Sequence, residues 1–136
     1  MNVRLAASRS TEAMPTFKNF DQFLHFLNDE ACHSAISPRK YAQALGMDFQ
    51  SLAAEAKLHR NTIARAPCAE SVQRHLRVSL CVLRAAADAT GSVEKGIYWY
   101  RNNPLPAFDY KTAQQVVADG RTAQLIRHIQ TLKPPR

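Results

Sequence analysis

The best candidates for contacts with a nucleic acid lie between residues 52 and 65. Four polar or basic residues there can share the exposed face of one short helix: Arg60, Asn61, Thr62 and Arg65. A guanidinium group binds phosphates or the edge of guanine, and an Asn amide pairs with adenine. We expect these four side chains to reach the major groove of DNA. The same residue types would also suit a solvated helix face in a protein that does not bind DNA.

The apolar residues around these four predict the helix-turn-helix that would position them. Leu52, Ala53 and Ala56 lie on one face of a first helix, and the two alanines are small enough to let a second helix approach. Leu58 and Ile63 would fill the angle between the two helices. The spacing therefore predicts a short helix, a tight turn and a basic second helix, as in a DNA-binding helix-turn-helix.

The turn between the two helices contains Lys57 and His59. His59 stands where the N-cap of the second helix is expected. Lys57 occupies the position where many helix-turn-helix proteins keep Gly, so the turn must be taken by another residue conformation. Both residues are predicted to contact the phosphates that flank the binding site, together with Arg39 and Lys40.

The distribution of charge favours a polyanionic partner. The 136 residues include 18 Lys and Arg against 11 Asp and Glu, for a net charge of +7. From Ser37 to Arg84 there are eight basic residues against three acidic ones, a net +5, whereas the first 36 residues carry −1. Neutralising phosphates with such a basic segment releases counterions and supplies non-specific affinity for DNA.

Apolar residues at helical spacing, together with capping signals, predict an all-α fold. Ser37, Asp48 and Ser92 are expected to cap helices, and Gly46 and Gly91 to end them. The expected helices run from about Phe17 to before Ser37-Pro38, from Pro38 to about Leu45, from Asp48 into the turn, from the turn to Pro67, from about Ala69 to Ala89, from Val93 to about Arg101, from about Thr112 to Asp119, and from about Thr122 to Leu132.

These elements suggest three regions along the chain. Residues 1–15 form a flexible N-terminal arm, residues 16–90 a helix-turn-helix domain, and residues 91–136 a smaller helical domain with a basic tail. The long helix from about Ala69 to Ala89 would join the two helical regions. The chain is short enough that they are expected to share one core.

Two apolar clusters in the second half predict what faces inward. The run Ile97 to Tyr100 has four consecutive large residues, which cannot all face one core, so part of it should lie at an interface. Trp99 is the member expected in the core. The last helix should turn four residues inward: Leu125, Ile126, Ile129 and Leu132.

Several classes of function are disfavoured by what the sequence contains. Cys32, Cys68 and Cys81 lack paired metal-ligand spacing and are expected to be buried or half-buried thiols in a reducing cytoplasm. The five histidines are scattered, and no nucleophile motif or phosphate-binding Gly loop is present. No segment approaches the roughly 20 apolar residues of a membrane span. We therefore expect a cytoplasmic protein that is no enzyme and has no metal or cofactor.

The second half of the chain carries a recognisable succession of motifs. In order, these are Glu94-Lys95-Gly96-Ile97-Tyr98-Trp99-Tyr100, Asn102-Asn103-Pro104-Leu105, Asp109-Tyr110-Lys111-Thr112-Ala113 and Val116-Val117-Ala118-Asp119-Gly120-Arg121, followed by a closing helix. This succession resembles the toxin-binding domain of the Xre/MbcA/ParS family of bacterial antitoxins. Ala113 departs from that family's pattern, because it replaces the usual proline after the Thr. With the preceding helix-turn-helix and the stretch from Ser71 to Arg77, the resemblance covers about Ser37 to Leu132.

The resemblance implies a function in a toxin–antitoxin system. An antitoxin of this family binds and neutralises a RES-type or related NAD-using toxin by covering its active site, and as a homodimer it binds operator DNA to repress its own operon. The residues that would contact the toxin are then Tyr98, Tyr100, Arg101, Tyr110, Arg121, Arg127, Lys133 and Arg136. Arg121 would lie beside free N–H groups at the start of the last helix, and Lys133 and Arg136 form a basic tail suited to a phosphate-binding pocket.

Two other functions remain compatible with these residues. The chain could be a free-standing transcriptional regulator whose C-terminal half only dimerises or senses a ligand. It could also be a protein-binding module whose helix-turn-helix no longer reads DNA, and such a protein would show no salt-dependent binding to its own promoter.

Overall fold

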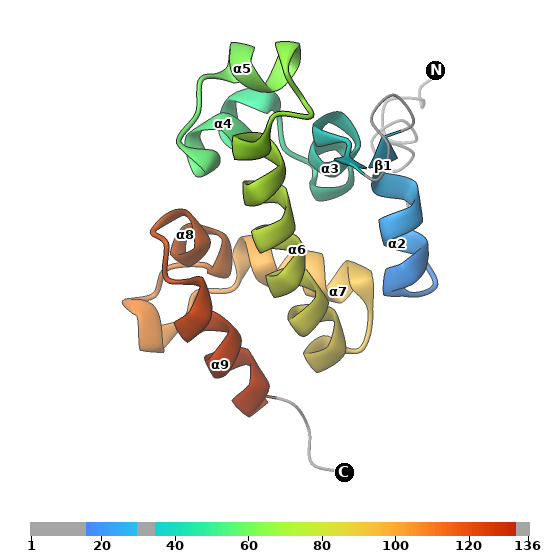
Figure 1. The fold of residues 1–136 in the computed structure, drawn as a ribbon. Coiled ribbons are helices and arrows are strands. Elements are labelled where there is room, and N and C mark those ends of the chain that lie inside the picture. The colour runs from blue at the N-terminus through green and yellow to red at the C-terminus, as the bar shows by residue number, and fades with distance from the viewer. Residues whose placement is uncertain (1–15, 30–34, 133–136) are drawn as a thin grey trace, which may run out of the picture.

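The computed structural model describes residues 16–29 and 35–132. Several predictions lie outside the described residues: the N-terminal arm, the expected thiol of Cys32, and the tail residues Lys133 and Arg136. Within the described part the chain is built almost wholly of helices, which confirms the all-α fold (Figure 1). None of these helices is both long enough and apolar enough to cross a membrane.

The N-terminal helix α2 (Phe20–Leu27) follows the predicted stripe of phenylalanines. Phe23 and Leu27 are buried, and the Phe17 and Phe23 rings pack with their centroids 5.0 Å apart. A short antiparallel pair of strands, β1 (Asn28–Asp29) and β2 (Ala35–Ile36), comes next and was not predicted. This pair leads the chain directly into the cap of the following helix.

The next three helices begin where the capping residues predict. In α3 (Pro38–Leu45), the Ser37 hydroxyl accepts a hydrogen bond from the Lys40 N–H, and Gly46 ends the helix at φ 71°. In α4 (Phe49–Ala56), the Asp48 carboxylate accepts from the Ser51 N–H at 2.8 Å, which lowers the pKa of Asp48. In α5 (Arg60–Arg65), the predicted cap His59 accepts from the Asn61 N–H through Nδ1. Local side-chain chemistry therefore sets each start.

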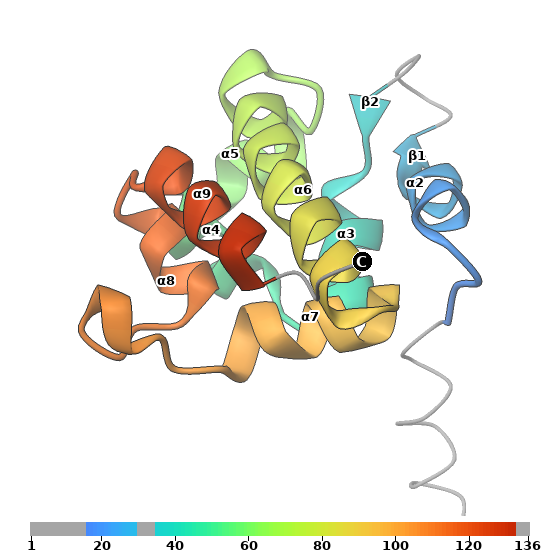
Figure 2. The same ribbon diagram turned by 90° about the horizontal axis from the view of Figure 1, so that it is seen from below.

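The long helix α6 (Glu70–Thr90) runs through the middle of the molecule (Figure 1). Seen from below, α8 (Ala113–Ala118) and α9 (Thr122–Leu132) lie on one side of α6, and α2 and α3 lie on the other (Figure 2). Gly91 ends α6 at φ 100°, and Ser92 caps α7 (Val93–Asn102), as predicted. Helix α6 therefore packs against elements of both halves of the chain.

The remaining α-helices of the C-terminal half pack against α6. After α7, the 3₁₀ helix η1 (Pro106–Phe108) leads to α8, whose cap is a complete capping box between Thr112 and Gln115. In α9, Leu125 and Ile129 are buried as predicted, but Leu132 is 45% exposed. The expectation that Leu132 faces inward is wrong, because the last turn of α9 extends beyond the core it packs against.

A single hydrophobic core joins residues from both halves. It runs without interruption from Phe23 and Leu52 through Leu76 and Leu83 to Val116 and Ile129 at the C-terminal end. At residue 91, where a boundary between the two helical regions was expected, the chain changes direction from α6 to α7, but the apolar core continues from one region to the other. The two helical regions share one core, as their size predicts.

Two cysteines in the described part differ from the expected buried thiols. Cys81 is a free thiol but is exposed, and Cys68 is disulfide-bonded. The position of Cys81 on the outer face of α6 explains its exposure, because that face carries the exposed residues Arg77 and Arg84 one turn away on either side.

The crossing of α6 and α7 depends on Gly96. A Cβ atom at residue 96 would lie 2.8 Å from the backbone nitrogen of Ala87, so only glycine lets the two backbones approach this closely. Replacing an ordinary helical Gly by Ala stabilises a protein by roughly 0.5–1 kcal/mol. We expect Gly96→Ala to do the opposite and to lower the free energy of unfolding by about 1–3 kcal/mol through overpacking.

Urea denaturation of the purified variant measures this effect. Lys95→Ala is the matched control, because Lys95 is exposed on the same helix and its replacement should change stability by less than about 0.5 kcal/mol. A Gly96→Ala protein as stable as the wild type would show that the two helices do not approach as described.

Candidate nucleic-acid interface

Helix α5 presents its polar face to solvent and its apolar face to the core. Arg60, Asn61 and Arg65 are exposed, and Thr62 is half-buried. Ile63 is 1% exposed and fills the angle between α4 and α5, as its spacing predicts. The structure therefore brings three of the four predicted base-contacting residues to the surface of one short helix.

Arg60 and Arg65 are also free to bind a partner. Neither guanidinium group forms a hydrogen bond or a salt bridge with any described residue, and Arg60 lies close enough to Asp48 only to help lower that residue's pKa. By contrast, other arginines are engaged: Arg77 with Glu70 at 2.8 Å, and Arg84 with Asp21 at 3.7 Å. Unpaired guanidinium groups on an exposed helix are available to phosphates or bases.

The residues predicted to flank them differ in availability. Arg39 is exposed and lies over the Phe49 ring at 5.5 Å, near α5. Lys40 is half-buried, and its ammonium donates to the Asn28 carbonyl at 3.1 Å. Since Lys40 also lies over the Phe26 ring, its charge is already held by α2 and β1 and is a poorer candidate for a phosphate contact.

A surface hollow lies between α4 and α5, and sequence reasoning did not foresee one of its residues. Gln50 lines it together with His59 and Arg60, and its floor is apolar, from Ala53 and Leu58. Gln50 is exposed at the start of α4, where an amide can donate to phosphate or accept from a base. Its position one residue after Phe49 in the first turn of α4 is the signal that could have identified it.

The turn between the two helices is made by Lys57 itself. Its backbone adopts the left-handed conformation at φ 60° and ψ 41°, which is the conformation that a glycine would take at this position. The sequence analysis expected a conformation other than that of a glycine at this turn, and that expectation is wrong. The side chain explains part of the difference, because the Lys57 Nζ donates to the Ala118 carbonyl at the end of α8, at 2.7 Å.

A buried carboxylate, Glu55, lies directly behind this interface. It is 8% exposed and accepts hydrogen bonds from three helices. His75 Nε2 lies 3.0 Å from Glu55 Oε2, the Tyr100 hydroxyl donates to the same oxygen at 3.2 Å, and Gln114 Nε2 donates to Oε1 at 2.7 Å. The sequence signal was weak, since Glu55 is one acidic residue among alanines.

This cluster resembles catalytic machinery only superficially. Ser79 approaches His75 at 3.5 Å, and Glu55 approaches it at 3.0 Å, but both contact the same ring nitrogen, Nε2. A catalytic triad needs the serine and the acid on opposite nitrogens of the imidazole. Ser79 is also completely buried. His75 is therefore placed to bond to the Glu55 carboxylate, and Ser79 contacts only the His75 ring.

Two buried tyrosines complete the polar centre of the fold. Tyr41 and Tyr100 are both 0% exposed, and burial raises the pKa of each hydroxyl well above its ordinary value of 10. Both hydroxyls therefore stay neutral at physiological pH. The Tyr41 hydroxyl has no hydrogen-bond partner among the described residues.

The residues expected to contact a toxin fall into two groups. Tyr98 and Tyr110 are each 70% exposed, and Arg127 is also exposed. The expectation for Tyr100 is wrong, because its side chain is wholly buried on Glu55 and cannot reach a surface partner. Arg121 is half-buried, with its guanidinium group over the Phe108 ring at 4.9 Å.

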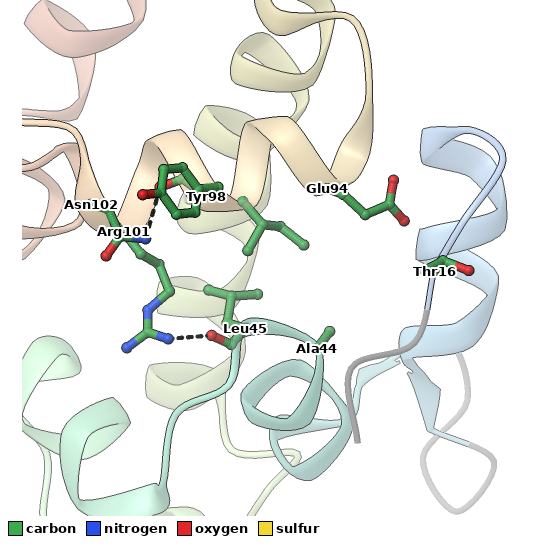
Figure 3. Close-up of a pocket in the computed structure, with 8 residues that line it drawn as sticks. Thr16, Ala44, Leu45, Glu94, Tyr98, Arg101 and Asn102 are labelled. Atoms are coloured by element: carbon green, nitrogen blue, oxygen red, sulfur yellow. Dashed lines mark hydrogen bonds between the residues drawn. The ribbon is translucent and has the colours of Figure 1, made fainter. Parts of the chain in front are cut away.

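Arg101 has a structural contact in place of the expected surface one. Figure 3 shows its guanidinium group reaching from α7 to the end of α3, where Nη1 donates to the Leu45 carbonyl. The same nitrogen also donates to the Gly46 carbonyl at 3.1 Å. A cation at the C-terminal end of a helix also interacts favourably with the helix dipole. Arg101 therefore ties the two halves together, and its expected contact with a toxin stays a prediction.

A mainly apolar cavity adjoins Arg101 between α3 and α7. Its walls include Leu45 and Ile97, and the exposed Tyr98 lies at its edge (Figure 3). At its other end, Glu94 accepts a hydrogen bond from the Phe17 N–H at 2.6 Å, which fixes the start of the described chain to α7. Trp99, the member of the run Ile97 to Tyr100 that was expected in the core, is only half-buried and packs against the core, whereas Ile97 and Tyr100 are buried in it.

Comparisons with known proteins do not extend this description: the chain matches no family model, no curated protein and no solved structure. The described residues also include no group of three or more His, Cys, Asp or Glu side chains that could hold a metal ion.

The Glu55 cluster should be a main contributor to stability. Glu55→Ala would leave the Tyr100 hydroxyl and the Gln114 amide buried without an acceptor, and we expect the free energy of unfolding to fall by about 3–5 kcal/mol. Chemical denaturation monitored by circular dichroism measures the loss.

Glu70→Ala is the control for this substitution. Glu70 is exposed and pairs with Arg74 and Arg77 at the surface, so its removal should cost no more than about 1 kcal/mol. Equal effects of the two substitutions would contradict a central role for Glu55.

Proposed function

We propose that the protein is a DNA-binding antitoxin that represses its own operon. The observation that carries the DNA-binding part is the pair of guanidinium groups of Arg60 and Arg65, which lie on the exposed face of α5 and have no partner among residues 16–29 and 35–132. Helix α5 is the second helix of a tight helix-turn-helix unit, the position from which such proteins read the major groove. The exposed Asn61 would add an adenine contact.

The toxin-binding part of the proposal depends on the resemblance of the second half to the Xre/MbcA/ParS antitoxins. Tyr98 and Tyr110 support it, because large exposed aromatic side chains are typical of protein interfaces. Arg127 adds an exposed charge on the same half of the chain. The proposed partner is a RES-type, NAD-degrading toxin whose active site this half would cover, and the proposed complex contains a homodimer acting in the cytoplasm.

Binding of the protein to a duplex from its own upstream region tests the DNA-binding part. We expect the wild type to bind with an affinity that falls steeply as salt rises, because phosphate contacts release counterions. Arg60→Ala with Arg65→Ala should weaken binding at least tenfold and reduce the slope of log affinity against log salt by about 2.

Arg127→Ala is the matched control, since it removes an exposed, unpaired arginine outside the helix-turn-helix. It should leave the affinity within about twofold, because screening limits the effect of a distant charge. Tight binding by the double variant would exclude α5 as the DNA reader.

Co-expression with the product of the adjacent gene tests the toxin-binding part. We expect that product alone to arrest growth, and this protein to restore growth and to co-purify with it. Tyr98→Ala with Tyr110→Ala should weaken the complex, because interface aromatics commonly contribute 2 kcal/mol or more. DNA binding without any growth arrest or complex would instead identify a free-standing transcriptional regulator.

A further inference from the structure

The turn before the DNA-reading helix is held by an element from the other half of the chain. Gln114 Nε2 donates to Glu55 Oε1 at 2.7 Å, and Lys57 Nζ donates to the Ala118 carbonyl at 2.7 Å. Glu55 and Lys57 belong to the end of α4 and the turn. Gln114 contributes its side chain and Ala118 its backbone carbonyl at the end of α8, so one helix supplies both contacts.

The turn needs such support because its conformation is unfavourable for its residue. A non-glycine residue in the left-handed region costs roughly 1–2 kcal/mol. Backbone bonds also hold the turn: the Lys57 N–H donates to the Ala54 carbonyl at 3.3 Å, and the Leu58 N–H donates to the Ala53 carbonyl at 2.9 Å. Helix α5 has only six residues, too few to be stable alone, so its direction depends on this turn and on Ile63 in the core.

Helix α8 is itself held firmly enough to act as a support. Its residues Ala113 and Val116 are completely buried, and the Thr112 capping box holds its first turn. Lys111 and Asp119, which flank the helix, form a salt bridge at 2.6 Å. The hydrogen bond from Lys111 lowers the pKa of Asp119, and the charge of Lys57 contributes in the same direction.

We propose that Gln114 and Lys57 are positioning residues of the DNA reader, through which α8 sets the direction of α5. The effect on DNA depends on the DNA-binding function proposed above, whereas the effect on the turn does not. This assigns the C-terminal half a direct part in DNA reading, and it gives Lys57 a contact with α8 in place of the predicted phosphate contact.

Amide hydrogen exchange of the whole chain without DNA tests the support of the turn. In Gln114→Ala, exchange at the Leu58 and Ala66 amides, which bond to carbonyls of the helix-turn-helix, should rise about fivefold. Amides in the middle of α6 should change by a smaller factor than those of the turn. Gln124→Ala is the control, because Gln124 is exposed on α9. Unchanged exchange in the turn, or a rise spread equally over α6, would overturn the proposal.

Binding to the upstream duplex tests the effect on DNA. Gln114→Ala and Lys57→Met should both weaken binding severalfold with an unchanged salt slope, because neither removes a phosphate contact. Lys57→Met keeps a non-glycine residue in the left-handed turn but removes the donor to Ala118, whereas Lys57→Arg should keep binding near the wild type because it keeps that donor.

The outcomes separate the two proposals. A salt slope reduced by about 1 in Lys57→Met alone would make Lys57 a phosphate contact and overturn its positioning role. If the wild type does not bind the duplex at any salt concentration, the proposed DNA-binding function fails, and the exchange data alone decide whether α8 supports the turn.

Discussion

The Glu55 carboxylate is the point on which the arrangement of helices depends. It lies in the core, where an uncompensated charge costs several kcal/mol, and its hydrogen-bond partners come from α6, α7 and α8. Those helices can satisfy it only if all of them are in place around α4. The carboxylate therefore couples the α4–α5 pair to the C-terminal half, although the sequence predicts two successive regions.

Contacts with acids and carbonyls also decide which basic side chains remain available to a partner. Surface acids pair with many of the basic side chains: Glu70 with Arg74 and Arg77, Asp21 with Arg84, and Asp119 with Lys111. Backbone carbonyls hold the charges of Lys40, Lys57 and Arg101. The excess positive charge of the chain is thus concentrated where acids are lacking, and α5 is one such place.

Much of the helical framework was predictable because the signals that start and end helices are local. Ser37, Asp48 and His59 each accept a hydrogen bond from an N–H two or three residues ahead, and Gly46 and Gly91 adopt the left-handed conformations that their type favours. The β1–β2 pair was not predicted, because two residues in each strand are too few for a periodic pattern. The exposed Leu132 was missed because spacing gives the apolar face of a helix but not where the surface it packs against ends.

The sequence by itself determined the all-α fold, the starts of α3, α4 and α5 and the basic face of α5, since these follow from residues close together in the chain. Only the tertiary structure decided the use of residues whose partners are distant in sequence. Arg101 and Tyr100 resemble surface contacts in the sequence, but their partners are 45 to 56 residues away in α3 and α4. Glu55 and Lys57 likewise meet α8 about 60 residues along the chain. The type of a side chain determines the kinds of group that it can bond to. Folding decides which of those groups lies within hydrogen-bond distance.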